Sequence, residues 1–466
     1  MTSLFILLFA YFVSFTDKPT NTTPALSERA IAQRTKWNIP TDDLDYPVDR
    51  SYVDSICQMG ATLCHTSRWF NGATFTMDDS LAMEVAQLPF VERIECTRDN
   101  GRNYSPRKKL AQKIEQTADT TSNITDTQLA LFNLLPLHQA GFEGQGILMT
   151  VCDGGFYKAN TLSAFRQSEL ELGHLDFTDD TDGFYGITGT HGTECLSTIT
   201  GLTDGYHGAA TRAQYYLMRS EEDVTESPKE MDNLIAAFEA ADSLGVNVFS
   251  VSLGYAEFDN NNWTLPKSAM DGKSTRCSLA ATIAARKGML ICVAAGNEGN
   301  SDWHIIDSPA DADSVLTVGA VDIYGNIGGF SSYGPTADGR VKPEVCALGV
   351  QAQLVYPDGS IVRSNGTSFA TPLLAGMAAS LWSALPDENA MQIRERIIRS
   401  ADRYTHPDPE RYGYGIPDAW EAYTMKTATD NVIGEGTVQS VKILHNGRIL
   451  ILRNGKVYDL TGSCIQ

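Results

Sequence analysis

Residues 365–372 (Asn-Gly-Thr-Ser-Phe-Ala-Thr-Pro) contain the side chain best suited to nucleophilic chemistry, Ser368. Gly366 allows a sharp turn, and a run of small apolar residues from Ser368 onward predicts a buried helix. A serine at the start of a helix lies beside unpaired backbone N–H groups and the positive end of the helix dipole, and both stabilise an oxyanion. An ordinary helix cap formed by Thr367 or Ser368, with Pro372 tolerated in the first turn, fits the same segment, so the chemistry depends on partners elsewhere.

Three further residues supply those partners. A serine hydroxyl needs a base to remove its proton, and histidine has a pKa suited to this near neutral pH. His191 opens a predicted helix in the sequence His-Gly-Thr, and Asp153 ends a predicted strand. A carboxylate such as Asp153 holds an imidazole in the correct tautomer and offsets its charge. Asn297 follows another strand and carries an amide N–H that can bind an oxyanion. Together with Ser368, these residues have the groups needed for acyl transfer.

Strand-like runs alternate with helical runs between residues 129 and about 426. Because the strands are apolar on both faces, the alternation predicts an α/β fold with a mostly parallel sheet and helices on both faces. Ligands of such sheets bind beyond the carboxyl ends of the strands, where Asp153, Ser252 and Asn297 lie. The predicted strands are 147–152, 214–218, 246–251, 289–294 and 315–321, and the predicted helices are 193–200, 229–244, 279–287, 368–385 and 391–401.

The order Asp153, His191, Ser368 and the motifs around these residues resemble the subtilisin-like serine proteases, the subtilases. The resemblance extends over about 300 residues, 129–426. It implies a catalytic triad of these three residues, with Asn297 at the oxyanion. One departure is Gly154, where the family usually has Ser or Thr. The resemblance also implies that an extended peptide substrate binds to Ser252, Leu253, Gly254, Ala294 and Gly296.

The resemblance further implies a serine endopeptidase that acts on protein or peptide substrates through an acyl-enzyme. It implies no required cofactor and no catalytic metal. Calcium sites are common in the family, but no contiguous acidic loop stands out, so structural calcium stays open. Cys195 lies one helical turn after His191, as in the thiol-containing subtilases.

Four alternatives to a subtilase agree less well with the sequence. A lipase or esterase would have Gly-x-Ser-x-Gly with its histidine last in the chain, whereas Ala370 lies two residues after Ser368. A sedolisin would carry an acid in place of Asn297. A zinc protease of the HExxH type lacks its motif here. A subtilase-like scaffold that only binds peptides remains as the non-enzymatic alternative, although all four key residues are present.

Composition restricts the partners. The 466 residues carry 36 basic and 57 acidic side chains, a formal charge of -21, which argues against nucleic acid or an anionic membrane as a partner. No run of about 20 apolar residues predicts a membrane span. The nine cysteines form no CxxC pair, so a zinc site is not indicated. A disulfide among Cys57, Cys64 and Cys96 stays open.

We divide the chain into four parts. Residues 1–20 contain a short apolar block and are expected to be a signal peptide, with a buried strand or helix as the alternative. In residues 21–125 the sequence suggests a strand at 68–75, a helix with the face Leu81, Val85 and Leu88 that stops before Pro89, and an extended segment from Val91. This unit resembles the small α+β inhibitory propeptide of subtilases, through segments 69–75 and 88–95. This interpretation predicts a zymogen, cut between residues 112 and 128; the alternative is an accessory binding domain. The propeptide would then be an intramolecular inhibitor.

The catalytic domain is expected at residues 126–430 and a short β-meander at 431–466, where Asn446-Gly447 and Asn454-Gly455 predict tight turns. The meander resembles the C-terminal segments that direct proteins through the bacterial type IX secretion system. A small β-appendage on the catalytic domain is the alternative. The expected location is secreted or at the surface of a bacterial cell.

Overall fold

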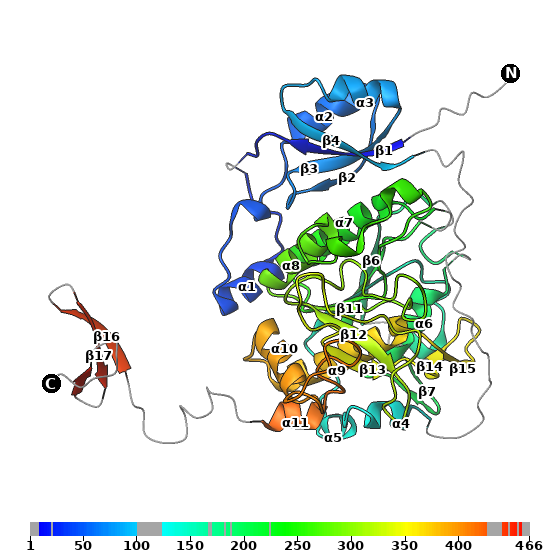
Figure 1. Cartoon of the computed structure of the whole chain (residues 1–466), viewed down its shortest axis with the longest axis vertical. Coiled ribbons are helices and arrows are strands. Elements are labelled where there is room, and N and C mark those ends of the chain that lie inside the picture. The colour runs from blue at the N-terminus through cyan, green and yellow to red at the C-terminus, as the bar shows by residue number, and fades with distance from the viewer. Residues whose placement is uncertain are drawn as a thin grey trace. The chain divides into compact units, whose positions relative to one another are not determined.

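The computed structural model of the chain describes residues 9–19, 22–99, 124–165, 170–180, 183–186, 189–222, 225–425, 440–445, 448–453 and 456–458. The chain forms two compact units, Met1–Tyr423 and Thr424–Gln466. The first unit holds a large parallel sheet with its helices and a smaller N-terminal domain (Figure 1). No helix in the described ranges combines the length and apolar character needed to cross a membrane.

A seven-stranded parallel sheet forms the core of the first unit, in the order β13-β12-β11-β10-β5-β9-β6. This confirms the predicted α/β fold, and each predicted strand is present. The inner strands are buried along their length, as their continuous apolar runs require. The strands are β5 (Leu148–Asp153), β6 (Glu171–Asp176), β9 (Gln214–Arg219), β10 (Val248–Val251), β11 (Leu290–Ala294), β12 (Leu316–Val321) and β13 (Val345–Leu348).

Helices cover both faces of this sheet, with α7 and α8 on one face and α6, α9 and α10 on the other (Figure 1). At the start of α7 the Glu230 carboxylate accepts a hydrogen bond of 3.1 Å from the backbone N–H of Ser227, and the helix ends at Gly245, whose φ of 75° is left-handed. The helices are α4 (Ile124–Ala130), α5 (Leu135–Gln139), α6 (His191–Thr200), α7 (Pro228–Leu244), α8 (Arg276–Arg286), α9 (Thr367–Ala384), α10 (Ala390–Arg399) and α11 (Ala419–Thr424).

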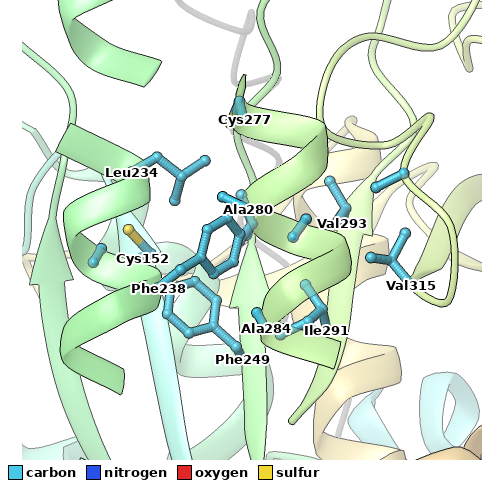
Figure 2. Close-up of a cluster of buried hydrophobic side chains, with 14 of the residues drawn as sticks. Cys152, Leu234, Phe238, Phe249, Cys277, Ala280, Ala284, Ile291, Val293 and Val315 are labelled. Atoms are coloured by element: carbon cyan, nitrogen blue, oxygen red, sulfur yellow. The ribbon is translucent and has the colours of Figure 1, made fainter. Parts of the chain in front are cut away.

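Figure 2 shows the apolar core that α7 and α8 form against the sheet. Phe238 of α7 packs on Phe249 of β10, with ring centroids 4.7 Å apart. Ala280 and Ala284 of α8 lie beside Ile291 of β11, and their small size allows the helix to approach the strand closely. This dense packing fixes the carboxyl ends of β10 and β11, where substrate-binding residues are expected.

The N-terminal domain has a four-stranded antiparallel sheet in the order β2-β3-β1-β4. Two helices lie between its strands in the sequence, α2 before β2 and α3 between β3 and β4, and an apolar core joins helices and sheet. The elements are β1 (Phe9–Phe15), α1 (Glu28–Trp37), α2 (Arg50–Gln58), β2 (Thr62–Ser67), β3 (Gly72–Met77), α3 (Asp79–Val85) and β4 (Val91–Arg98). Cys57, Cys64 and Cys96 of this domain are free thiols.

The strand β1 corrects the interpretation of residues 1–20 as a signal peptide. Phe9–Phe15 pairs with both β3 and β4, and six of its seven residues are buried. The alternative, a buried strand, is therefore the one found. A short apolar block suits both the centre of a signal peptide and an inner strand, so composition alone could not separate the two.

A second correction concerns residues 68–75, which the sequence suggests as one strand. The chain turns here instead, since β2 ends at Ser67 and β3 begins at Gly72. Asn71 has a φ of 44° in the turn, a left-handed conformation that asparagine tolerates better than most residues. The predicted helix before Pro89 and the extended segment after it are present as α3 and β4.

Buried charged groups join the N-terminal domain to α7. The carboxylate of Glu239 accepts hydrogen bonds from the backbone N–H groups of Arg68, at 2.8 Å, and Trp69, at 3.1 Å. The guanidinium groups of Arg34 and Arg68 both bind Asp242, at 2.7 and 2.6 Å. These side chains are almost wholly buried, so the N-terminal domain packs closely against α7 and excludes water from the contact.

Smaller sheets complete the fold. A hairpin of β14 (Ala352–Val355) and β15 (Ile361–Ser364) leads into α9, and β7 (Leu202–Thr203) pairs with β8 (Tyr206–His207). The second unit is the predicted meander, formed by β16 (Ser440–His445), β17 (Arg448–Arg453) and β18 (Lys456–Tyr458). Its two expected Asn-Gly turns lie outside the described residues.

Candidate active site

The carboxyl ends of three adjacent strands gather residues expected to do chemistry. Asp153 is the last residue of β5, Ser252 directly follows β10, and Asn297 lies beyond the end of β11. β10 lies between β5 and β11 in the sheet, so the three segments are neighbours. His191 reaches this edge as the first residue of α6, and Ser368 as the second residue of α9.

Asp153 and His191 form a direct pair. The distance from His191 Nδ1 to Asp153 Oδ1 is 2.8 Å. The Asp153 side chain is 1% exposed and that of His191 is 32% exposed, so the pair has a buried end and an accessible end. The N–H of Gly154 donates to the same carboxylate oxygen at 2.8 Å. A Cβ added to Gly192 would lie 2.9 Å from Asp153 Cβ, so only a glycine lets α6 begin this close to β5.

This pairing controls the proton affinity of the imidazole. Burial opposes the charged form of His191, but the charge and the hydrogen bond of the Asp153 carboxylate favour it, and the pKa of His191 is raised well above its ordinary value. An imidazole in this setting gains a proton readily from a neighbouring hydroxyl. It is neutral, and able to act as a base, only above its raised pKa.

The backbone of Ser368 is held by an unusual contact. Pro372 has no N–H to bond the Ser368 carbonyl oxygen, as the fourth residue onward would in a regular helix. The hydroxyl of Ser252 donates to that oxygen instead, at 2.8 Å. The Ser368 hydroxyl in turn donates to the carbonyl oxygen of Ser252, at 3.5 Å. The end of β10 thus fixes the start of α9.

The approach to α9 differs from the sequence expectation. Gly366 has φ 160° and ψ 145°, so the chain reaches the helix in an extended conformation rather than through a sharp glycine turn. The helix itself begins at Thr367 and is buried through Trp382, as its small apolar residues predict.

Cys195 lies between the imidazole and α9. Its Sγ is 3.8 Å from His191 Nδ1 and 3.3 Å from the Ser368 carbonyl oxygen. Burial raises the pKa of Cys195 to about 11, so the group is a neutral thiol near pH 7. It therefore packs beneath the pair without adding a charge to it.

Asn297 is oriented by the residue before Ser368. Its side-chain oxygen accepts from the backbone N–H of Thr367 at 2.9 Å and from the Thr367 hydroxyl at 3.1 Å. These bonds fix the plane of the amide, whose NH₂ group lies on the other side of the amide carbon. That NH₂ group is the donor that an oxyanion beside Ser368 can meet.

The residues expected to bind substrate lie on the two segments that flank Ser368 and Asn297. Ser252 is buried, Leu253 is half-buried and Gly254 is exposed, beyond β10. Ala294 is the buried last residue of β11, and Gly296 has a left-handed φ of 104°. The exposed backbone of Gly254 can pair with an extended peptide.

Two groups of side chains in the described part of the chain bring three metal-ligating atoms within 4.8 Å of one another. The first is Asp153, His191 and Cys195, where the neutral thiol is a poor ligand. The second is Glu221, Glu226 and Glu230. Glu221 already accepts the Tyr255 hydroxyl at 2.5 Å, and Glu230 accepts two backbone N–H groups. We assign a metal to neither group.

Sequence reasoning missed two residues that position the site. It treated Pro372 as a tolerated residue of the first turn and gave Thr367 only a cap role. The spacing of Ser368 and Pro372 could have shown that one carbonyl would need a new donor. The bond between Thr367 and Asn297 joins residues 70 positions apart and has no pattern in the sequence.

Comparisons with known proteins agree with this geometry. A model of the subtilase family matches residues 144–415, and a model of the peptidase S8 propeptide domain of Bacteroidota matches residues 10–116. Neither match extends to the C-terminal meander, whose role as a sorting signal stays a prediction.

Individual relatives are also similar. Subtilisin DY of Bacillus licheniformis is 30% identical over 280 residues, which are 59% of this chain and 90% of that relative. A thermostable alkaline protease of Halalkalibacterium halodurans is 28% identical over 312 residues, 66% of this chain and 76% of that relative. The crystal structure of MycP1 from the ESX-1 type VII secretion system shares the fold, with a TM-score of 0.53 and 22% identity over 70% of this chain and 93% of that chain.

The family model covers more than half of the chain, and it spans the strands and helices that carry Asp153, His191, Asn297 and Ser368. The N-terminal domain, with its antiparallel sheet, falls within the propeptide match. The chain therefore belongs to the subtilase family of serine endopeptidases and is made with a propeptide.

Proposed function

We propose that Ser368, His191 and Asp153 are the catalytic triad of this endopeptidase. The observation that carries the proposal is the 2.8 Å contact between His191 and Asp153 at the strand edge that also holds Ser368. His191 Nε2 takes the hydroxyl proton as Ser368 Oγ attacks a peptide carbonyl carbon. The same proton then passes to the leaving amine, and the carbonyl carbon stays bonded to Oγ as an ester. Water then gives a proton to His191 as it attacks the ester carbon. The bond from that carbon to Oγ breaks, His191 returns the proton to Oγ, and the acid is released.

Asn297 and the backbone N–H of Ser368 would bind the oxyanion formed in each step. The hydrogen bond from Thr367 to the Asn297 amide and the position of Ser368 in α9 support this role, because they hold both groups in fixed orientations. The substrate would lie extended along Ser252, Leu253 and Gly254, with Ala294 and Gly296 on its other side.

A fluorophosphonate probe tests this proposal against the alternative of a scaffold that only binds peptides. The activated enzyme should be labelled at Ser368, because the reagent forms a covalent bond only with a hydroxyl activated by its base. Peptide mapping would locate the label. Binding of peptides without labelling would favour the scaffold.

Replacing Asn297 by alanine should lower kcat about 10²–10³-fold, the effect known for the equivalent change in subtilisin. The KM should change little, because the lost N–H acts on the transition state. Steady-state kinetics on one peptide substrate would measure this. Asn300→Ala, a few residues onward in the same loop, is the control and should stay within a few-fold of the parent enzyme. An equal loss in both variants would contradict an oxyanion role.

We also propose that the propeptide inhibits its own catalytic domain until it is cut between residues 112 and 128. Beyond β4, Asp99 accepts a hydrogen bond of 2.9 Å from Asn260, in the loop that continues from Gly254. Arg98 pairs with Asp179 at 2.9 Å. These contacts support an arrangement in which the last residues of the propeptide lie on the substrate-binding side of the catalytic domain.

Loss of Arg68 should release the cut propeptide sooner. Arg68 and Asp242 form a pair whose side chains are 8% and 3% exposed, and breaking a buried pair costs about 3–5 kcal/mol. We expect Arg68→Ala to shorten the delay between self-cleavage and full activity at least about tenfold. The delay is read from activity after cleavage is complete on a gel, with active sites counted by fluorophosphonate labelling.

Arg50→Ala is the matched control for this change, because Arg50 is exposed and pairs with Asp54 of its own helix. Equal delays in the two variants would show that the α7 contact does not retain the propeptide.

The propeptide type supports a bacterial source, and the similarity to subtilisins supports action outside the cell. A propeptide that blocks activity until it is cut suits an enzyme that leaves the cell before it is active. Fractionation of a culture, followed by fluorophosphonate labelling of cells and medium, tests the location.

A further inference from the structure

Asp307 lies against the two segments that are expected to bind substrate, those of Gly254 and Gly296. It belongs to the connection between β11 and β12. A Cβ added to Gly254 would lie 3.0 Å from Asp307 Cβ and 3.2 Å from its Oδ2. A Cβ added to Gly296 would lie 2.7 Å from the same Oδ2. The carboxyl group therefore sits between the ends of β10 and β11, against backbone that carries no side chain.

The protein supplies few hydrogen-bonding or cationic partners to this carboxyl group. Asp307 is 7% exposed, and its Oδ1 is buried without a hydrogen-bond partner. No lysine, arginine or histidine within the described ranges forms an ion pair with it. A buried acid without a partner is unfavourable, so such groups in native structures call for an explanation. A cationic group brought by a ligand would supply the missing partner.

The proposed reaction brings a side chain to this position, and the inference rests on that proposed function. The attacked carbonyl must lie between Ser368 and the amide of Asn297. A peptide extended along Gly254 alternates its side chains between the solvent and the sheet. The residue that supplies the carbonyl thus directs its side chain between the Gly254 and Gly296 segments, toward Asp307.

We propose that Asp307 makes this enzyme selective for substrates with arginine or lysine at the residue that supplies the attacked carbonyl. Their long side chains carry the charge far enough from the backbone to reach a carboxylate below the strand ends. Glu298, half-buried beside Gly296 and Asn297, adds a second negative group near the path of that side chain. Large apolar side chains would instead cover the carboxyl group and leave it without a partner.

The protonation of the free site agrees with this role. Burial, and then the charge of Glu298, raise the pKa of Asp307 well above its ordinary value. The side chain of Trp303 acts against this shift of the pKa, and the smaller effects of Glu257 and Asp311 add to it. A bound cation favours the carboxylate and displaces the proton. Selectivity for a cationic side chain should therefore increase as the pH rises.

Four peptides that differ only at this residue provide the test: arginine, its neutral isostere citrulline, lysine and leucine. For the activated wild-type enzyme we expect kcat/KM for arginine to exceed that for citrulline about 100-fold, the size found for buried charge pairs. In Asp307→Asn the ratio of arginine to citrulline should fall close to one. Asp302→Asn, an exposed acid of the same loop, is the control and should keep the wild-type ratio.

The outcomes separate the two proposals. The proposed selectivity is wrong if the wild-type enzyme cuts leucine or citrulline peptides as fast as arginine peptides. It is also wrong if Asp307→Asn keeps the wild-type ratio. In both cases the proposed protease function stands. If no peptide is cut and no fluorophosphonate label forms, the proposed function itself fails. The ratio of arginine to citrulline at increasing pH needs no variant. A ratio that falls as the pH rises would also overturn the role of Asp307, even if Asp307→Asn does not fold.

Discussion

Ser368→Ala is expected to lower kcat about 10⁶-fold, the size of effect that loss of the nucleophile has in subtilisin, and to abolish self-cleavage. The variant keeps the helix α9 and the carbonyl contact with Ser252, because both depend on the backbone of residue 368. What it loses is the hydroxyl oxygen that we propose forms the acyl-enzyme. The full-length chain should therefore accumulate with its propeptide attached. Peptide hydrolysis and gel analysis of the purified chain measure the two effects.

Ser383→Ala is the control, since Ser383 lies near the other end of α9 and donates only within its own helix, to the Ser380 carbonyl. It should mature and cut peptide like the parent enzyme. Added wild-type enzyme should cut the Ser368→Ala chain between residues 112 and 128, which shows that the site is intact. Self-cleavage that persists in purified Ser368→Ala would remove this residue from the mechanism.

Asp153→Asn is expected to lower kcat about 10⁴-fold, as loss of the acid does in other triads. The amide can present its NH₂ group to His191 and favour the wrong tautomer, and it no longer offsets the imidazolium charge. A shift in the pH profile should accompany the loss. Because Asp153 raises the pKa of His191, its removal lowers that pKa, and the residual activity should persist to lower pH than in the parent enzyme.

Residual kcat across a pH series measures both effects. Asp204→Asn, an exposed acid beyond α6, should leave the rate and the profile unchanged. A pH midpoint that moves upward in Asp153→Asn would contradict the assigned pairing, as would a loss of less than about tenfold.

The sequence was most informative where a local pattern determines the structure. The run of small apolar residues after Ser368 predicted α9, and the apolar runs before Asp153 and Asn297 predicted β5 and β11. Asp153, Ser252 and Asn297 each follow such a run, so the alternation of strands and helices placed these three at one edge of the sheet. His191 and Ser368 reach the same edge as the first and second residues of their helices. The strand β6 was missed because it lies at the edge of the sheet and is mostly exposed, which leaves no apolar run to detect. The four residues of β13 are too few to show a period.

Contacts between distant residues could not be predicted in this way. The docking of Arg68 on Asp242 joins residues 174 positions apart, and a buried arginine looks the same in sequence as an exposed one. The position of Asp307 depends on the path of an irregular loop. The signal-peptide error has a related cause, because the partners of β1 in its sheet, β3 and β4, follow much later in the chain.

Ser368, the proposed nucleophile, lies on α9, which packs against four neighbouring strands of the parallel sheet, β10, β11, β12 and β13. Displacing Ser368 would mean disrupting the interior of the domain, rather than loosening a surface loop. Heat should therefore inactivate the mature enzyme in a single step together with global melting, and no folded but inactive form should accumulate.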